Sequence, residues 1–152
     1  MADVRIRPAR REDLPRIVEL LTDDDLGRGR EHPREDPSPY AEAFRDIDEG
    51  PRNDLIVVEA AGEVIATLQL TFIPSSTHTG GERAQVEGVR VAAGSRSMGV
   101  GRQLLDWAIF RAEKRGCKMV QLTTDKRRAD ARRFYESLGF GATHEGMKLK
   151  LK

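Results

Sequence analysis

The amino-acid sequence predicts a single α/β domain over residues 1–152, built on a mixed, mostly antiparallel sheet flanked by about four helices. In the first half of the chain, three strand-like segments follow one another with glycine-containing turns between them, which is typical of an antiparallel meander. In the second half, a strand, an amphipathic helix and a short apolar strand follow in succession, which indicates a parallel pair joined by a crossover helix.

The first part of the chain reads as a strand, a helix, a loop and a second helix. Residues 4–7 alternate as a strand, and residues 10–21 carry apolar side chains at helical spacing. Residues 22–39 contain consecutive aspartates, glycines and prolines, so we expect an irregular loop there. A second helix is predicted from about Tyr40 to Glu49. The meander follows, with predicted strands at residues 55–60, 64–73 and 83–91.

The second half of the chain continues with a helix, a strand, a helix and a final strand. Residues 99–115 have apolar side chains at intervals of three and four, and Gly116 supplies the helix stop. Residues 119–123 form a short buried strand, and residues 129–138 form a short helix. Residues 140–151 alternate well enough to predict a terminal strand or hairpin arm.

A glycine-rich loop between the strand at 83–91 and the helix at 99–115 is the strongest functional signal. The segment 89–105 reads VRVAAGSRSMGVGRQLL, and its loop contains Arg96-x-x-Gly99-x-Gly101. Glycine lets the backbone approach an anion without an interfering Cβ. The first turn of the following helix presents unpaired N–H groups at the positive end of its dipole. The sequence therefore predicts a ligand that carries phosphates.

Two other phosphate-binding motifs fit this loop less well. A Walker A loop requires four residues between its glycines and a Lys-Ser or Lys-Thr pair after the second, whereas Arg102 and Gln103 follow Gly101. A dinucleotide fingerprint requires a third glycine where Leu104 stands, and Asp125 is an isolated candidate for its acidic residue. The first motif is excluded, and the second is the weaker interpretation.

The Arg-x-x-Gly-x-Gly loop after a Val-x-Val strand, together with the later segment RRFYESLGF, resembles the GCN5-related N-acetyltransferase (GNAT) family. This resemblance implies a single N-acetyltransferase domain in which the loop holds the pyrophosphate of acetyl-coenzyme A. It also implies that the pantetheine arm pairs with the strand at 83–91, where the N–H of Val91 polarises the thioester carbonyl. The implied cofactor-binding residues are Val89, Val91, Arg96, Met98, Gly99, Val100, Gly101 and Arg102.

Transfer of an acetyl group to an amine needs a neutral amine and a proton for the departing thiolate. Glu87 is the predicted base: it lies four residues before Val91 on one strand, and so on the same face of a regular strand. A solvent-facing carboxylate without a catalytic role remains an alternative for Glu87. Tyr135 matches the tyrosine that the family places beside the thiolate. Many members carry an asparagine seven residues earlier, where this chain has Arg128.

Composition excludes several other classes of protein. The net charge of +1, from 26 basic and 25 acidic residues, gives no overall attraction to nucleic acid or membrane, and no apolar run is long enough to span a bilayer. The basic cluster at 126–133 lacks interleaved aromatics, so a solvated helix start is the plainer interpretation. The single Cys117 is expected to be a small buried hydrophobe, and the histidines have no metal-ligand spacing.

The sequence therefore predicts a cytoplasmic N-acetyltransferase that uses acetyl-coenzyme A and no metal. Its acceptor is expected to be the amine of a small molecule or peptide, chosen by residues 22–49 and 74–82, and no nucleic-acid or membrane partner is expected. A homodimer is left open. The alternative is a non-catalytic acyl-coenzyme A sensor or interaction module that keeps the loop but does not use the proton chemistry.

Overall fold

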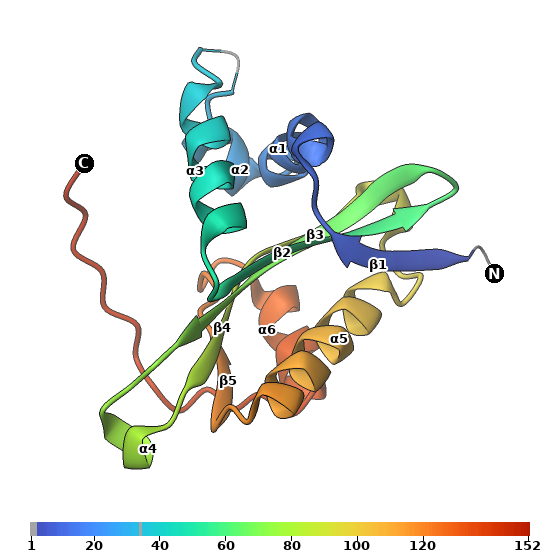
Figure 1. Cartoon of the computed structure of the whole chain (residues 1–152). Coiled ribbons are helices and arrows are strands. Elements are labelled where there is room, and N and C mark those ends of the chain that lie inside the picture. The colour runs from blue at the N-terminus through green and yellow to red at the C-terminus, as the bar shows by residue number, and fades with distance from the viewer. Residues whose placement is uncertain (1–2, 34) are drawn as a thin grey trace.

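The computed structural model describes residues 3–33 and 35–152, and it places one five-stranded sheet at the centre of the molecule (Figure 1). The strands lie in the order β1-β2-β3-β4-β5; the first four are antiparallel, and β5 runs parallel to β4. This confirms the predicted mixed, mostly antiparallel sheet. The strands are β1 (Val4–Pro8), β2 (Asn53–Ala60), β3 (Glu63–Ile73), β4 (Arg83–Val91) and β5 (Met119–Leu122).

Helices cover both faces of the sheet (Figure 1). On one face lie α1 (Leu14–Thr22), α2 (Asp25–Arg30) and α3 (Ser38–Glu49), and on the other lie α5 (Val100–Arg115) and α6 (Ala129–Ser137). A single turn, α4 (Thr77–Gly80), connects β3 to β4, and short 3-10 turns stand at Arg11–Asp13 and Ala93–Ser95. None of the described helices is both long and apolar enough to cross a membrane.

Each face of the sheet has its own apolar core. The larger core lies under α5, where Leu104, Leu105 and Ala108 have no exposed surface and pack on the alternate residues of β3 that include Leu68 and Leu70. The smaller core lies under α1 and α3. Burial of such leucines contributes about 2 to 5 kcal/mol each when measured by truncation to alanine. The α5 core therefore anchors the helix that follows the glycine-rich loop.

The described residues differ from the sequence predictions in two segments. The expected loop at 22–39 contains α2, because Asp24 accepts a hydrogen bond from the Gly27 N–H at 2.5 Å and so caps the start of a helix. The expected terminal strand at 140–151 is absent: these residues are extended but pair with no strand of the described chain. With α2 and the single turn α4, the described chain contains six α-helices rather than about four.

Candidate active site

The glycine-rich loop has the backbone of an anion-binding site. Ser97 and Gly99 both have left-handed conformations, with φ of 71° and 78°, and Gly99 is the residue that caps the start of α5. Alternation of this kind turns successive N–H groups toward one point. Within the described chain, the first backbone bond across this junction runs from the Gln103 N–H to the Gly99 carbonyl at 3.1 Å. The N–H groups of the first turn are therefore free to bind an anion.

The two glycines of the loop have different roles. A Cβ at Gly99 would meet no atom within 4 Å, so the space beside this residue is open for a ligand. A Cβ at Gly101 would lie 3.5 Å from Cζ of Phe134, which is ordinary contact distance. Gly101 therefore brings α6 against the first turn of α5, while Gly99 keeps the anion site open.

The other residues predicted in the loop lie around the same junction. Met98, Gly99 and Arg102 are exposed, whereas Val100 is buried in the larger core and fixes the start of α5. Arg96 forms a hydrogen bond within the protein: its Nε donates to the Val91 carbonyl at 3.2 Å and so holds the loop against the end of β4.

The backbone of β4 is unpaired on one side next to this loop. β5 pairs with β4 only as far as Val86, opposite Leu122, among the described residues. Ala66 faces Val91, and the Ala92 N–H donates to the Ile65 carbonyl at 2.8 Å, the pattern of a non-hydrogen-bonded antiparallel pair. In such a pair the N–H and C=O of Val91 point away from β3. They therefore lie along the open edge of β4.

A bulge in β4 overturns the face predicted for Glu87. Gln69 faces Glu87 and Thr67 faces Arg90, so two steps on β3 correspond to three on β4, and Gly88 takes the left-handed φ of 62°. The extra residue reverses the alternation of side chains. Glu87 therefore shares its face with Arg90, toward α1 and α2, and not with Val91. The prediction that Glu87 and Val91 share a face was wrong, because it assumed a regular strand.

The sheet face that carries Glu87 has a row of polar side chains. Asn53, Thr71, Gln85 and Gln121 lie directly opposite one another across four strands. Thr71 donates to Asn53 at 3.0 Å, and Gln121 donates to Gln85 at 2.6 Å. In the part of the chain that the structure describes, the exposed Glu87 carboxylate forms no such hydrogen bond. It is therefore free to bind a cation or accept a proton.

Tyr135 lies on α6 at the edge of the larger core. Its ring contacts Phe134 and Phe140, with centroids 5.4 Å and 5.9 Å away. Burial raises the pKa of the Tyr135 hydroxyl, and the positive charges of Arg90 and Arg128 act against that rise. The phenol is therefore protonated at neutral pH. Because Phe134 meets the first turn of α5 and Arg90 belongs to β4, Tyr135 lies near the loop and the open edge of β4.

An arginine pair beside Tyr135 was missed by the sequence analysis. Arg90 is 15% exposed, with its Nε 3.6 Å from Oδ2 of Asp24, and Arg128 donates to the same oxygen at 2.6 Å. Among the described residues, the Arg90 Nε has no hydrogen-bond partner. Burial, and then the nearby Arg128, lower the pKa of Arg90. Asp24 and Arg128 are 104 residues apart, so no local spacing could have indicated the pair.

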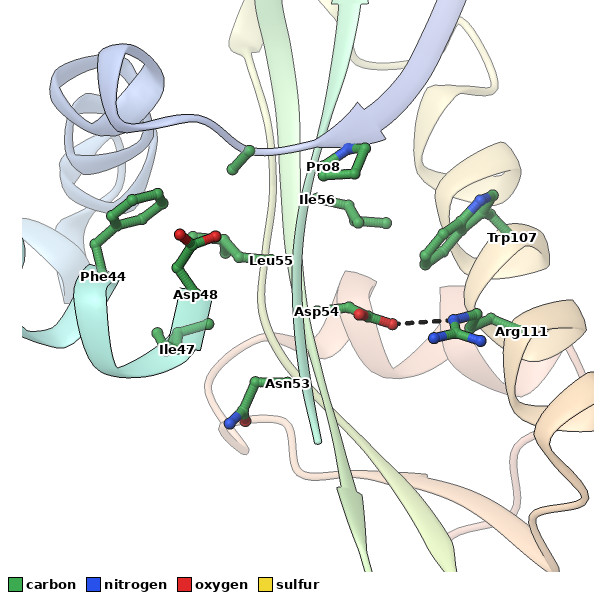
Figure 2. Close-up of a pocket in the computed structure, with 11 residues that line it drawn as sticks. Pro8, Phe44, Ile47, Asp48, Asn53, Asp54, Leu55, Ile56, Trp107 and Arg111 are labelled. Carbon is green, nitrogen blue, oxygen red and sulfur yellow. Dashed lines mark hydrogen bonds and ion pairs between the residues drawn. The ribbon is translucent and has the colours of Figure 1, made fainter. Parts of the chain in front are cut away.

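Two hollows lie away from the loop. One, of about 340 Å³, lies between α3 and α5 at the start of β2, where Trp107 and Arg111 lie across the strand from Phe44 (Figure 2). It includes none of the predicted catalytic or cofactor-binding residues, although Phe44, Ile47 and Asp48 belong to the segment expected to choose the acceptor. The other, of about 570 Å³, lies beside α1 and α2 in the segment expected to choose the acceptor. It is lined by Glu19, Thr22, Asp23, Arg28, Glu31, His32, Pro33 and Glu35.

Each basic residue of the cluster at 126–133 forms an ion pair with a carboxylate. The pairs are Lys126–Glu145, Arg127–Asp125, Arg128–Asp24, Arg132–Glu136 and Arg133–Asp130.

Burial raises the pKa of the Cys117 thiol, which disfavours the nucleophilic thiolate. Among the described residues, no group of three His, Cys, Asp or Glu side chains could hold a metal ion.

The mixed sheet with helices on both faces defines the α/β fold of the acetyltransferases. The chain belongs to the acetyltransferase (GNAT) family, whose model matches residues 14–140. It is also similar to an aminoalkylphosphonate N-acetyltransferase of Salmonella typhimurium, with 30% identity over 83 residues. That match covers 55% of this chain and 53% of the relative, so it spans about half the length of the relative.

Solved structures share the whole fold. A protein from Bacillus halodurans C-125 described as a transcriptional regulator is 48% identical, with a TM-score of 0.94 over 98% of this chain and 100% of that chain. A predicted acetyltransferase with acetyl-CoA from Clostridium acetobutylicum is 21% identical, with a TM-score of 0.78 over 97% of this chain and 96% of that chain. The second likeness concerns the fold alone.

Proposed function

We propose that the protein is an acetyl-CoA-dependent N-acetyltransferase that moves an acetyl group directly to the primary amine of a small molecule or peptide. One observation carries the proposal: the free N–H groups of Met98 to Arg102 follow a bulged strand, β4, whose outer edge is unpaired beyond Val86 among the described residues. Membership of the acetyltransferase family supports it.

The residues around the loop fit the coenzyme. The N–H groups of Met98 to Arg102 would hold the pyrophosphate, and the open space at Gly99 leaves room for it. The N–H of Val91 would polarise the thioester carbonyl, because it points to the open edge of β4. Val89 would offer the same strand to the pantetheine arm, with Arg96 holding the loop against β4. Bound acetyl-CoA supplies the activated acetyl group.

Glu87 and Tyr135 would move the two protons of the transfer. Glu87 takes a proton from the ammonium of the acceptor, and the neutral amine forms a bond to the carbonyl carbon. The carbon–sulfur bond then breaks, and Tyr135 protonates the departing thiolate. The raised pKa of Tyr135 suits this role, since the hydroxyl keeps its proton at neutral pH. Water can relay the proton to Glu87, because this carboxylate is exposed.

Coenzyme binding tests the first half of the proposal. Thermal unfolding is measured with acetyl-CoA, coenzyme A, ATP and NAD, each far above a plausible dissociation constant. Coenzyme A and acetyl-CoA are expected to stabilise the protein, by about 2.7 kcal/mol at a hundred times the dissociation constant. Stabilisation by NAD instead, or by none of the four, would mean that the loop binds another ligand.

Turnover of an amine panel tests the second half. The panel includes aminoalkylphosphonates, because the relative from Salmonella typhimurium is named for that activity. It also includes amino acids, aminoglycosides and peptides. Glu87→Gln should lower turnover at neutral pH but recover as the pH approaches the pKa of the amine, because the amine is then neutral without a base. A defect that stays constant across pH would assign Glu87 to binding alone.

A second candidate function is a non-catalytic acyl-coenzyme A sensor. It is favoured by the likeness to the Bacillus halodurans protein described as a transcriptional regulator, which is 48% identical. Both functions need the loop to bind coenzyme A, but only the enzyme needs Glu87 and Tyr135 to move protons. If coenzyme A stabilises the protein but no amine of the panel is acetylated, and Tyr135→Phe leaves coenzyme binding unchanged, the sensor becomes the better interpretation.

A further inference from the structure

Two arginines and one aspartate meet beside the unpaired part of β4. Arg90 belongs to β4, Arg128 directly precedes α6, and Asp24 directly precedes α2. Nη1 of Arg128 donates to Oδ2 of Asp24 at 2.6 Å, and Nε of Arg90 lies 3.6 Å from the same oxygen. The charges of both arginines act on the hydroxyl of Tyr135, so the cluster lies near the residue that would protonate the thiolate.

The cluster has more positive than negative charge. Both oxygens of Asp24 are already engaged, because Oδ1 accepts from the Gly27 N–H and Oδ2 accepts from Arg128. Within the described chain, Arg90 forms one hydrogen bond, from Nη1 to the Val89 carbonyl at 2.7 Å, and its Nε is buried without a partner. A mostly buried cation with unused N–H donors is costly in the free protein. A ligand anion at this point would gain both charge and hydrogen bonds.

Among the residues that the structure describes, no neighbouring carboxylate supplies the missing charge. Arg30, whose charge also acts on Arg90, is paired with Glu31 at 2.6 Å. Glu87 shares a face of β4 with Arg90, but it is exposed and forms no ion pair with that arginine. Burial, and then the charge of Arg128, lower the pKa of Arg90, yet a guanidinium keeps its charge at neutral pH.

We propose that Arg90 and Arg128 bind an anionic group of the acceptor, so that the substrate is a small zwitterion with a carboxylate or phosphate beside its amine. This inference rests on the proposed acetyl transfer. A guanidinium can donate two parallel hydrogen bonds to either kind of anion. The three steps from Glu87 to Arg90 match two steps on β3, so their Cα atoms are about 7 Å apart. One small molecule can therefore place its ammonium at Glu87 and its anion at Arg90.

The position of the pair favours the acceptor over the coenzyme as the source of the anion. The side chain of Arg90 lies on the α1 and α2 side of the sheet, where it meets Asp24. The glycine-rich loop leads into α5, which covers the opposite face (Figure 1). Coenzyme and acceptor would therefore reach the open edge of β4 from opposite faces, and each would have its own anion site.

Binding of matched amines to the complex with coenzyme A tests the inference without turnover. This complex has no acetyl group to transfer, so calorimetry reports affinity alone. β-Alanine is compared with β-alaninamide, and O-phosphoethanolamine with ethanolamine, because each pair differs mainly in the anion. The wild type should bind at least one anionic member ~10-fold more tightly than its matched amine. Equal affinity within both pairs, or no binding of any member, would overturn the inference.

Two variants assign this preference to the arginines. Arg90→Gln and Arg128→Gln should each remove most of the preference for the anionic member, while the affinity for coenzyme A stays unchanged. Arg127→Gln is the matched control, because Arg127 adjoins Arg128 but has a 72% exposed side chain paired with Asp125. This control should keep the preference. Weaker coenzyme A binding with an unchanged preference would assign the arginines to a coenzyme phosphate and overturn the inference.

The stability of the free protein separates binding from a structural role. Arg90→Met removes the uncompensated charge and keeps a long side chain, so the midpoint of thermal unfolding without ligands should rise or stay the same. A lower midpoint would assign Arg90 a structural role instead. Failure of the acetyltransferase proposal has a different signature, because the anionic amines would still bind to the wild type but none would be acetylated.

Discussion

Glu87 and Arg90 lie on the same face of β4, although they are three positions apart along the strand. The separation is odd because Gly88 occupies a bulge with φ of 62°. This relationship places a free carboxylate and a half-buried guanidinium on the side of the sheet that α1 and α2 cover. It also leaves Val91, on the other side of the bulge, with its N–H toward the open edge of β4.

Gly88→Val should disturb both the fold and the proposed site. A left-handed conformation costs a non-glycine residue roughly 1 to 2 kcal/mol, so the free energy of unfolding should fall by about that amount. Space is not the cause, since a Cβ at Gly88 would lie 3.9 Å from Leu21 Cδ2. Chemical denaturation measures the loss. Gly29→Val is the control, because Gly29 has open space and no left-handed φ. Equal losses in the two variants would contradict the explanation.

Gly99→Glu should strongly weaken the binding of coenzyme A. The new side chain would fill the open space at the start of α5 and would place a negative charge where the pyrophosphate is expected. Calorimetry should show an affinity at least ~10-fold weaker, which is about 1.4 kcal/mol. Gly94→Glu adds the same charge in the same loop, at a position with open space and no left-handed φ, and should bind nearly as the wild type does. Equal weakening by both would indicate a general charge effect.

Tyr135→Phe should lower kcat by about 100-fold or more while coenzyme binding is kept, because the thiolate then leaves without its proton donor. Burial raises the pKa of Tyr135, so the loss of wild-type activity that comes from its ionisation should lie above pH ~10. Ser137→Ala is the control: it removes an exposed hydroxyl from the same helix, one that donates to the Phe134 carbonyl at 2.6 Å, and kcat should not change. A Tyr135→Phe enzyme with normal kcat would remove this residue from the mechanism.

Asp13→Ala should destabilise the fold by about 3 kcal/mol, because it leaves the buried Arg7 guanidinium without its main partner. Asp13 accepts from Arg7 at 2.7 Å and 3.0 Å, and Arg7 is 8% exposed. Glu19→Ala breaks an exposed pair with Arg16 and should cost less than ~1 kcal/mol. Thermal or urea unfolding of the two variants measures the difference, and similar losses would contradict the argument.

The same pair gives the protein a pH dependence with a defined sign. The hydrogen bond from Arg7 lowers the pKa of Asp13, and burial only partly opposes this. The folded protein therefore holds Asp13 ionised more strongly than the unfolded chain does. Its contribution is complete above the unfolded pKa of ~3.9 and is lost as the pH falls through the lower folded value. Acid unfolding of Asp13→Asn should show a shallower loss over that range, and an unchanged profile would contradict this.

The sequence by itself determined the elements that depend on interactions between residues close to one another in the chain. Side-chain periodicity identified β4 and α5, and the loop between them was predicted because glycines and a helix start lie within a few residues of one another. The family followed from the same loop and the FYESLGF segment, and the family model confirms it. Short-range signals of this kind need no knowledge of what packs against them.

Tertiary structure decided the rest, because the interactions concerned join distant residues or depend on a strand partner. The bulge that turns Glu87 toward Arg90 exists only in the register of β4 against β3. The contact between Asp24 and Arg128 spans 104 residues, and no spacing rule connects them. Residues 140–151 have the alternation of a strand, yet a strand needs a neighbour to bond with, and the described chain supplies none within itself.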